Sequence, residues 1–226
     1  EVQSIYGIWD NLDSGGSSVY PIDRSNLTEQ QFHTEVSKVH NHEVRTVTQN
    51  SVDYEENGAS SKMGWYNDLD ICPASDSGCS VPEFPGERSI RNLLVSDEVV
   101  YGATILPSSN AQCSVGPGGW IFALNMSTGG AVDNVLFDLE GDGDFDEDDA
   151  VSDGDGNLDS DEIPQMIRVE NGLPSDLAFL NDAKEGDECQ ERICYQTSAG
   201  ELECICKQSE SEYPLGRLSW KELFQN

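Results

Sequence analysis

The chain has 226 residues, with 43 acidic against 12 basic side chains and a formal net charge of -31. A surface of this charge repels nucleic-acid phosphates and anionic lipid headgroups, and it attracts cations. The negative charge therefore makes a nucleic-acid partner unexpected. No run of about 18 apolar residues is present, so no membrane span is expected. The length suits one sizeable domain over residues 1–226. Strand-like sequence begins at once after Glu1 without a signal-peptide pattern, as in a mature product or an excised piece.

Five segments are rich in β-branched and aromatic residues or alternate in polarity and therefore predict strands. Short turn-rich pieces separate the last three segments, which is typical of a sandwich, a barrel or a propeller. The sequence thus predicts an all-β domain. The predicted strands are residues 2–9, 44–49, 89–95, 98–105 and 119–125, and residues 64–69 could form the end of a strand.

Helical periodicity is weak throughout the chain. Residues 27–39 are the best helix candidate, because Leu27, Phe32 and Val36 fall roughly on one face, although a strand competes there. Residues 173–182 predict at most one helical turn. Residues 183–212 are polar, acidic and rich in cysteine, and they indicate a stapled loop or hairpin outside the core.

Seven cysteines are present, and none forms the paired CxxC arrangement of a zinc site. Short spacings within 72–79, 189–194 and 204–206 are typical of loop staples and favour an oxidising, extracytoplasmic setting. A reduced protein with scattered buried thiols is the alternative. The odd number leaves one cysteine free, or paired outside this sequence.

The strongest signal lies in residues 138–162, which hold 13 acidic side chains and no Lys or Arg. Its first part matches the twelve-residue pattern of an EF-hand calcium loop, with Gly143 at the sharp turn and Phe145 as the apolar anchor. Alternate residues of such a loop point inward and supply the six to eight oxygens that Ca²⁺ requires. The expected ligands are Asp138, Glu140, Asp142, Asp144 through its backbone carbonyl, Asp146 and Asp149.

A second loop in the same register runs from Val151 to Glu162, after Ala150 alone. Val151 cannot ligate through its side chain, so this loop is either a weaker site or part of a shared one. One intervening residue leaves no room for flanking helices, which predicts an EF-hand-like loop inserted in another fold. The expected ligands are Asp153, Asp155, Asn157, Asp159 and Glu162.

Two other interpretations of the polar residues compete with calcium binding. A disordered acidic linker would explain the charge, but not the recurring glycines and apolar anchors. His40 and His42 would face one side of a strand and could form a two-histidine metal site without an obvious third ligand. Motifs for a nucleophile elbow, a P-loop or a dinucleotide fold are absent.

Several segments together resemble the C-terminal β-propeller of PilC/PilY-type type IV pilus tip proteins. The order and spacing of these segments fit that family across nearly the whole chain. They are SIYGIWD at 4–10, GWYNDL at 64–69, the block GERSIRNLLVSDEVVYGATILPSSNAQCSVGPGGWIFALNMSTGG at 86–130, FDLEGDGDFDEDD at 137–149 and GRLSWKEL at 216–223.

The resemblance implies a calcium-binding, non-enzymatic component of a type IV pilus at the bacterial surface. Pilus biogenesis, adhesion and twitching motility are the family's roles, and its regulatory calcium site maps onto Asp138, Glu140, Asp142 and Asp146. Other pilus proteins and a host or surface receptor are the expected partners. The strands amount to about three blades, so a second chain would have to complete a propeller, or the closure differs.

Two further functions stay open from the sequence. One is a structural subunit or cap of an extracellular filament, which an unpaired cysteine or an exposed strand edge would favour. The other is a quinoprotein-like propeller enzyme, because GWIFALNMSTGG at 119–130 is similar to a blade motif of that group. No cofactor-ligating constellation accompanies that motif, and function follows sites rather than folds.

Overall fold

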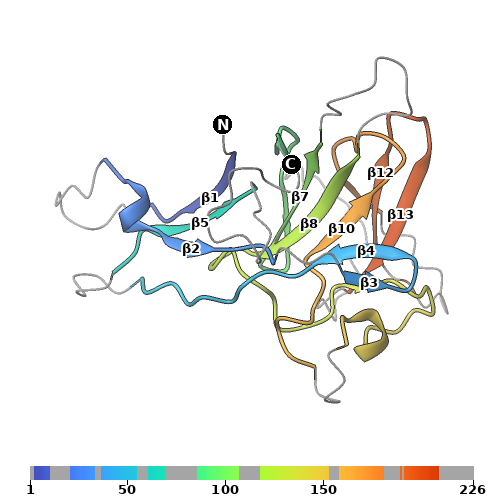
Figure 1. The fold of residues 1–226 in the computed structure, drawn as a ribbon, viewed down its shortest axis with the longest axis horizontal. Coiled ribbons are helices and arrows are strands. Elements are labelled where there is room, and N and C mark those ends of the chain that lie inside the picture. Colours follow the sequence, from blue (N-terminus) through green and yellow to red (C-terminus); the bar gives the residue numbers. More distant parts are fainter. Residues whose placement is uncertain are drawn as a thin grey trace, which may run out of the picture.

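The computed structural model describes residues 3–10, 21–33, 37–54, 61–69, 86–106, 118–152, 158–180, 189 and 191–208. Within these ranges the fold is almost entirely β, in agreement with the predicted fold class (Figure 1). Two short 3-10 helices, η1 (Arg24–Asn26) and η2 (Glu147–Asp149), are the helical elements of the described part. Neither approaches the length or apolarity that crossing a membrane requires.

The described strands form three open sheets. The first sheet has the order β1 (Ser4–Ile8), β5 (Gly64–Asp68) and β2 (Thr28–Gln30). The central sheet has the order β3 (Ser37–Val39), β4 (His42–Arg45), β10 (Met166–Val169), β8 (Gly119–Asn125), β7 (Val99–Ile105) and β6 (Leu94–Ser96). The third sheet has the order β11 (Ala178–Leu180), β12 (Glu191–Gln196), β13 (Leu202–Lys207) and β9 (Phe137–Asp138).

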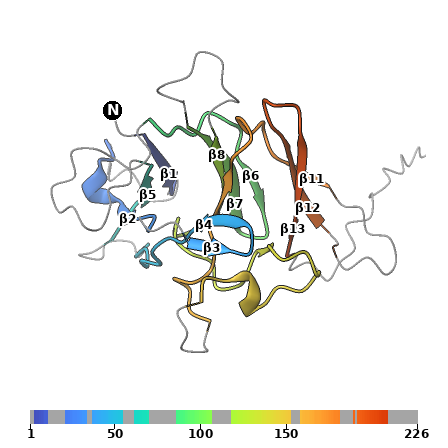
Figure 2. The ribbon, with the colours of Figure 1, turned by 45° about the vertical axis from the view of Figure 1, so that its right-hand side comes forward.

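The central sheet lies between the other two, and both of its faces are buried (Figures 1 and 2). Successive side chains of a strand point to opposite faces. In β8, Trp120 and Phe122 pack with Ile5 of the first sheet. Ile121 of the same strand packs with Ile193 of the third sheet. Burial on both faces explains why residues 119–125 form a continuous apolar run instead of alternating with polar residues.

Close packing requires glycine at two places, one within the central sheet and one between the central and first sheets. A Cβ on Gly102 of β7 would lie 2.3 Å from the Phe122 ring of the neighbouring strand. Gly129 has φ +70 and lies against the indole of Trp65, where a Cβ would be 2.1 Å from a ring atom. The tight turn that STGG at 127–130 predicts therefore also docks the first sheet on the central one.

Both helix predictions are wrong. Residues 27–39 contain β2 and β3 instead of a helix, and residues 173–182 contain β11. Leu27 and Phe32 are buried, but in two separate apolar clusters. Their apparent helical spacing reflects two chain segments in different layers, because tertiary pairing with β5 and β4 decides the local structure.

The predicted strands are present with altered limits. The predictions at 2–9, 64–69, 98–105 and 119–125 correspond to β1, β5, β7 and β8. The prediction at 44–49 is only partly met, because β4 ends at Arg45 and Val47 then forms an isolated bridge with Phe32. The prediction at 89–95 shortens to β6, which begins at Leu94.

The cysteine-rich segment is a hairpin, as predicted, but its disulfides differ from the spacing-based expectation. Cys189 bonds Cys206, and Cys194 bonds Cys204. Cys194 and Cys204 are directly opposite each other in the β12–β13 register, so both bonds cross the hairpin instead of closing short loops. The other three cysteines lie outside the described residues.

The hairpin also contributes to the core, which the sequence did not predict. Ile193 and Tyr195 of β12 are buried in the larger apolar cluster. Lys207 of β13 is fully buried, 2.9 Å from Glu191 and 3.2 Å from Asp97 in the β6–β7 turn. The contact between Lys207 and Asp97 joins the third sheet to the central sheet.

Candidate metal centre

The acidic loop, residues 138–149, starts from the short strand β9, which pairs with β13 of the disulfide-bonded hairpin. Asp138 lies opposite Cys206 in that pairing. The loop ends in η2, whose N-cap is Asp146. The described part of the loop is thus bounded by a strand and a 3-10 helix instead of the two α-helices of a complete EF-hand. This agrees with the predicted absence of flanking helices.

Carboxylates at the two ends of the acidic loop hold its backbone. The Asp138 side chain accepts hydrogen bonds from the N–H groups of Gly141 at 2.5 Å and Gly143 at 3.0 Å. Asp149 Oδ1 accepts from the N–H groups of Leu139 at 2.5 Å and Glu140 at 3.2 Å. Gly143 has φ 90, the left-handed conformation that a tight turn at this position requires. The chain thus curls around positions 1, 6 and 12 of the predicted pattern.

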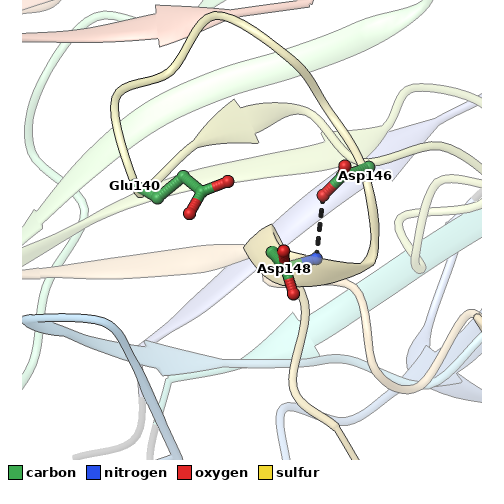
Figure 3. Close-up of side chains that lie close together, drawn as sticks. All are labelled: Glu140, Asp146 and Asp148. Carbon is green, nitrogen blue, oxygen red and sulfur yellow. Dashed lines mark hydrogen bonds between the residues drawn. The ribbon is translucent and has the colours of Figure 1, made fainter.

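Three exposed carboxylates come close together at this loop (Figure 3). Glu140, Asp146 and Asp148 each offer an oxygen, and these oxygens lie within 4.8 Å of one another. Two oxygens on opposite sides of one Ca²⁺ are about 4.6–5.2 Å apart, because each Ca–O distance is about 2.3–2.6 Å. The spacing of this acidic cluster therefore suits a shared calcium ion.

Charge repulsion accompanies the clustering. The pKa of Glu140 is raised by desolvation and by the neighbouring charges of Asp142 and Asp148. The pKa of Asp149 is also raised, chiefly by burial. Asp149 is 1% exposed, and its Oδ2 has no hydrogen-bond partner. A buried, unpartnered carboxylate oxygen destabilises a protein unless a proton or a cation satisfies it.

The structure brings only some of the predicted ligands together. Glu140 and Asp146 meet in the cluster, and Asp142 lies near Glu140. Asp144 is exposed, and its N–H donates to Asp142 Oδ1 at 2.9 Å. Asp138 and Asp149 bind the loop backbone. Whether each of these residues coordinates a metal stays a prediction.

The sequence predicted neither that Asp148 belongs to the cluster nor that His40 contacts it. Asp148 occupies position 11 of the EF-hand pattern, where no ligand is expected. His40 comes from the β3–β4 turn, where φ is 51, and its Nε2 lies 3.0 Å from the Asp148 carbonyl oxygen and 3.6 Å from Glu140 Oε2. The sequence separation of 108 residues carries no local signal for this contact. His42, half-buried in β4, has a lowered pKa because of burial, and a two-histidine site stays unsupported.

The second predicted loop is only partly described. Asp153, Asp155 and Asn157 lie outside the described residues. Val151 N–H donates to the Glu162 carbonyl, and Glu162 Oε2 accepts from Asp159 N–H at 2.9 Å, so the ends of the loop meet. Leu158, which occupies the position in this loop that Phe145 has in the first, packs on the larger apolar cluster. Metal binding by this loop stays a prediction.

The chain is similar to bacterial type IV pilus biogenesis factors. PilY1 of Pseudomonas aeruginosa strain UCBPP-PA14 is 29% identical over 149 residues, which is 61% of this chain and 12% of that protein. PilY1 of strain PAO1 is 30% identical over 143 residues. A PilY1 homolog of Xylella fastidiosa is 32% identical over 139 residues, 62% of this chain and 10% of its own length. The similarity shows homology over about three fifths of this chain. The matched part is only about a tenth of each relative's length. No protein-family model matches the chain.

The chain shares its fold with a solved domain of Pseudomonas aeruginosa PilY1. The crystal structure of the Pseudomonas aeruginosa PilY1 C-terminal domain superimposes with a TM-score of 0.66, at 23% identity. The match covers 91% of this chain and 36% of that domain. The described strands form no closed sheet, so the propeller itself stays a prediction.

Proposed function

We propose that this chain is a calcium-binding, non-enzymatic part of a type IV pilus biogenesis and adhesion factor at the bacterial surface. The association with pili rests on the homology to PilY1. The two disulfides across the hairpin agree with an oxidising, extracytoplasmic location.

The observation that carries the calcium proposal is the cluster of Glu140, Asp146 and Asp148 in the acidic loop. Glu140, Asp146 and Asp148 present oxygens at a spacing that suits Ca²⁺. Asp149, which follows Asp148 in the same loop, has a buried Oδ2 without a hydrogen-bond partner. Hard oxygen ligands in this number favour Ca²⁺ over softer metals, and Mg²⁺ prefers to keep several waters.

The proposed physical role of calcium is to hold the loop against the third sheet. Without the ion, like charges in the loop repel each other and the buried carboxylate lacks a partner. Binding would stabilise the folded loop by mass action, so its order would follow the calcium concentration outside the cell. Other pilus proteins, and a host or surface receptor, are the proposed partners.

The test replaces the cluster in the bacterium that carries the gene. The change Asp146→Asn with Asp148→Asn keeps side-chain size but removes two charges. We expect loss of calcium-dependent surface piliation and twitching motility, with the protein still present by immunoblot. Glu170→Gln, an exposed acid outside the loop, is the matched control. Unchanged, calcium-dependent piliation in the double variant would refute the role of the cluster.

A further inference from the structure

Three reactive groups meet where the disulfide-bonded hairpin contacts the central sheet. Lys207 of β13 is directly opposite Glu191 of β12 in the hairpin register, so both side chains lie on the same face. The Lys207 Nζ atom is 2.9 Å from Glu191 Oε2 and 3.2 Å from Asp97 Oδ2 in the β6–β7 turn. It also donates to the Gln208 carbonyl at 3.1 Å. A primary amine is thus held between two carboxylates, one of them 110 residues away in the sequence.

Burial and aromatic rings keep water from this amine. The Lys207 side chain is fully buried, and that of Glu191 is 6% exposed. Nζ lies 5.4 Å from the centroid of the Tyr101 ring and 5.6 Å from that of the Phe179 ring. The two rings pack edge to face, with their centroids 5.2 Å apart. The Asp97 side chain is 27% exposed, so a released water molecule has a way out. A site that otherwise excludes water protects reactive groups from hydrolysis.

The turn between β6 and β7 presents Asp97 to the amine. Ser96 and Val99 are paired, which leaves Asp97 and Glu98 as the two turn residues. Both have positive φ, 50 and 62, as a type I′ hairpin turn requires. Glycine is favoured at the second position of this turn, and a Glu with positive φ is uncommon. The Ser96 hydroxyl donates to Asp97 Oδ2 at 2.9 Å, and Lys207 Nζ donates to the same oxygen. The turn and these two hydrogen bonds hold the carboxyl group beside Nζ.

We infer that Lys207 and Asp97 join through an amide bond between their side chains, with Glu191 as the catalytic proton carrier. Glu191 takes a proton from the ammonium group, and the neutral Nζ then attacks Cγ of Asp97. The new Nζ–Cγ bond forms as one Cγ–O bond of Asp97 breaks. Two of the three ammonium protons leave with that oxygen as water, and Glu191 passes them to it in turn. The products are a neutral amide, one water and an unchanged Glu191 carboxylate, so no further reactant is required.

Held geometry replaces the chemical activation that amide formation otherwise requires. Well-oriented groups within one molecule react as if their concentration were about 10⁵–10⁸ M, provided that the reacting atoms are about 3–3.5 Å apart. Nζ is 3.2 Å from an oxygen that is bonded to Cγ, which is close to this range. Lys38 and Glu43 offer the contrast, at 3.9 Å with the Lys38 side chain 73% exposed. Water competes at that exposed pair, so it should stay an ion pair.

The amide bond joins the third sheet to the central sheet covalently. Because Asp97 and Lys207 are 110 residues apart, the bond closes a long loop and restricts the unfolded chain. The two sheets therefore stay linked when the hairpin disulfides are reduced. This inference goes beyond the proposed function, and it depends neither on calcium binding nor on a role in pili.

The test is the mass of the intact chain after its disulfides are reduced. We expect a mass lower than that of the sequence by one water. After digestion with trypsin and chymotrypsin, tandem mass spectra should show a branched peptide that joins the segments around Asp97 and Lys207, without cleavage after Lys207. The full sequence mass, in a chain whose two hairpin disulfides had formed before reduction, would overturn the inference. A water loss confined to one unbranched peptide would also overturn it, because that marks a cyclic imide or a cyclised Glu1.

Three variants assign the roles of the groups. Lys207→Arg keeps the positive charge but removes the primary amine, so it should have the full sequence mass. Glu191→Gln keeps the side-chain size but cannot carry the protons, so most molecules should lack the bond although Lys207 and Asp97 are present. Glu43→Gln changes the exposed pair with Lys38 and is the matched control, which should lose one water like the natural chain. Formation of both hairpin disulfides confirms that each variant folds. Water loss in Lys207→Arg would overturn the bond, and complete cross-linking in Glu191→Gln would overturn the role of Glu191.

Discussion

The acidic loop and the disulfide-bonded hairpin lie side by side, yet different forces hold them. Asp138 of the loop pairs with Cys206 of the hairpin across β9 and β13. The hairpin is closed by two covalent bonds and by the buried Lys207 ion pair. The loop is closed by carboxylates that accept from backbone N–H groups while repelling one another. Neighbouring segments can therefore respond differently to the solution, because covalent bonds hold the hairpin while the loop holds several like charges without a cation.

The largest effect should come from removing the buried cation of the hairpin. Lys207→Met leaves Glu191 buried without its cation and should lower the free energy of unfolding by about 3–5 kcal/mol. Lys38→Met removes an exposed ion pair with Glu43 and should cost less than about 1 kcal/mol. Urea unfolding of both variants measures the difference. Equal effects would mean that the Lys207 contact is not desolvated.

Removing one disulfide should weaken the hairpin slightly less. Replacing Cys189 and Cys206 by serine opens a loop of 17 residues and should cost about 3 kcal/mol. Replacing Cys194 and Cys204, 10 residues apart, should cost nearly the same, since the entropy of closure varies slowly with length. Chemical unfolding in chelator is the measurement. A loss well below about 1 kcal/mol for both pairs would show that packing alone holds the hairpin.

Calcium should act on the loop and add less than the covalent bonds. At a calcium concentration of about 100 times Kd, stabilisation is about 2.7 kcal/mol, which corresponds to a rise in Tm of roughly 5–10 °C for a chain of this size. Magnesium at the same concentration should produce a much smaller rise. Thermal melts in calcium, magnesium and chelator make the comparison. Equal shifts with both ions would indicate general screening of charge instead of a site.

The smallest expected effect concerns Asp149, whose Oδ1 accepts backbone hydrogen bonds while its Oδ2 is buried without a partner. Asp149→Asn keeps the Oδ1 acceptor for Leu139 and Glu140 but removes the charge. In chelator the variant should be more stable than the natural chain by about 1 kcal/mol, because a buried unpartnered carboxylate is costly. In calcium the order should reverse. Loss of stability in chelator would contradict this account of the buried oxygen.

The same variant gives the pH dependence. Burial raises the pKa of Asp149 in the folded chain above its unfolded value. The folded state then binds the proton more tightly, so this group's stabilisation is complete below the unfolded pKa of about 3.9 and is lost as pH rises through the raised, folded pKa. The stability advantage of Asp149→Asn in chelator should therefore be largest at neutral pH and disappear on acidification. Melting curves of both proteins across this range provide the check.

The sequence predicted a strand correctly where the residues of that one segment are enough to indicate it. Residues 119–125 are apolar throughout because both faces of β8 are buried, and the prediction of a strand is confirmed. Residues 27–39 failed because their apolar positions serve two layers, which no local period encodes. The disulfide pairing failed for a related reason, since it follows the register between β12 and β13 and not the spacing along the chain.

The candidate site shows the same limit. The acidic loop was predicted from its glycine and aspartate spacing, and the bonds of Asp138 to Gly141 and Gly143 agree with the expected curl. Asp148 was missed because the loop closes through the 3-10 turn of η2, which brings position 11 inward. The contact of His40 with the acidic loop was not predicted, because only the packing of the β3–β4 turn on the loop creates it.

The most direct test of the central claim is a calorimetric titration of the intact chain with calcium. We expect saturable binding to the acidic loop, with most of the heat lost in the variant that combines Asp146→Asn and Asp148→Asn and retained in Glu170→Gln. Asp142→Ala should also remove most of the binding. No heat with the natural chain, or the same heat in the double variant, would contradict the claim that this loop is a calcium site.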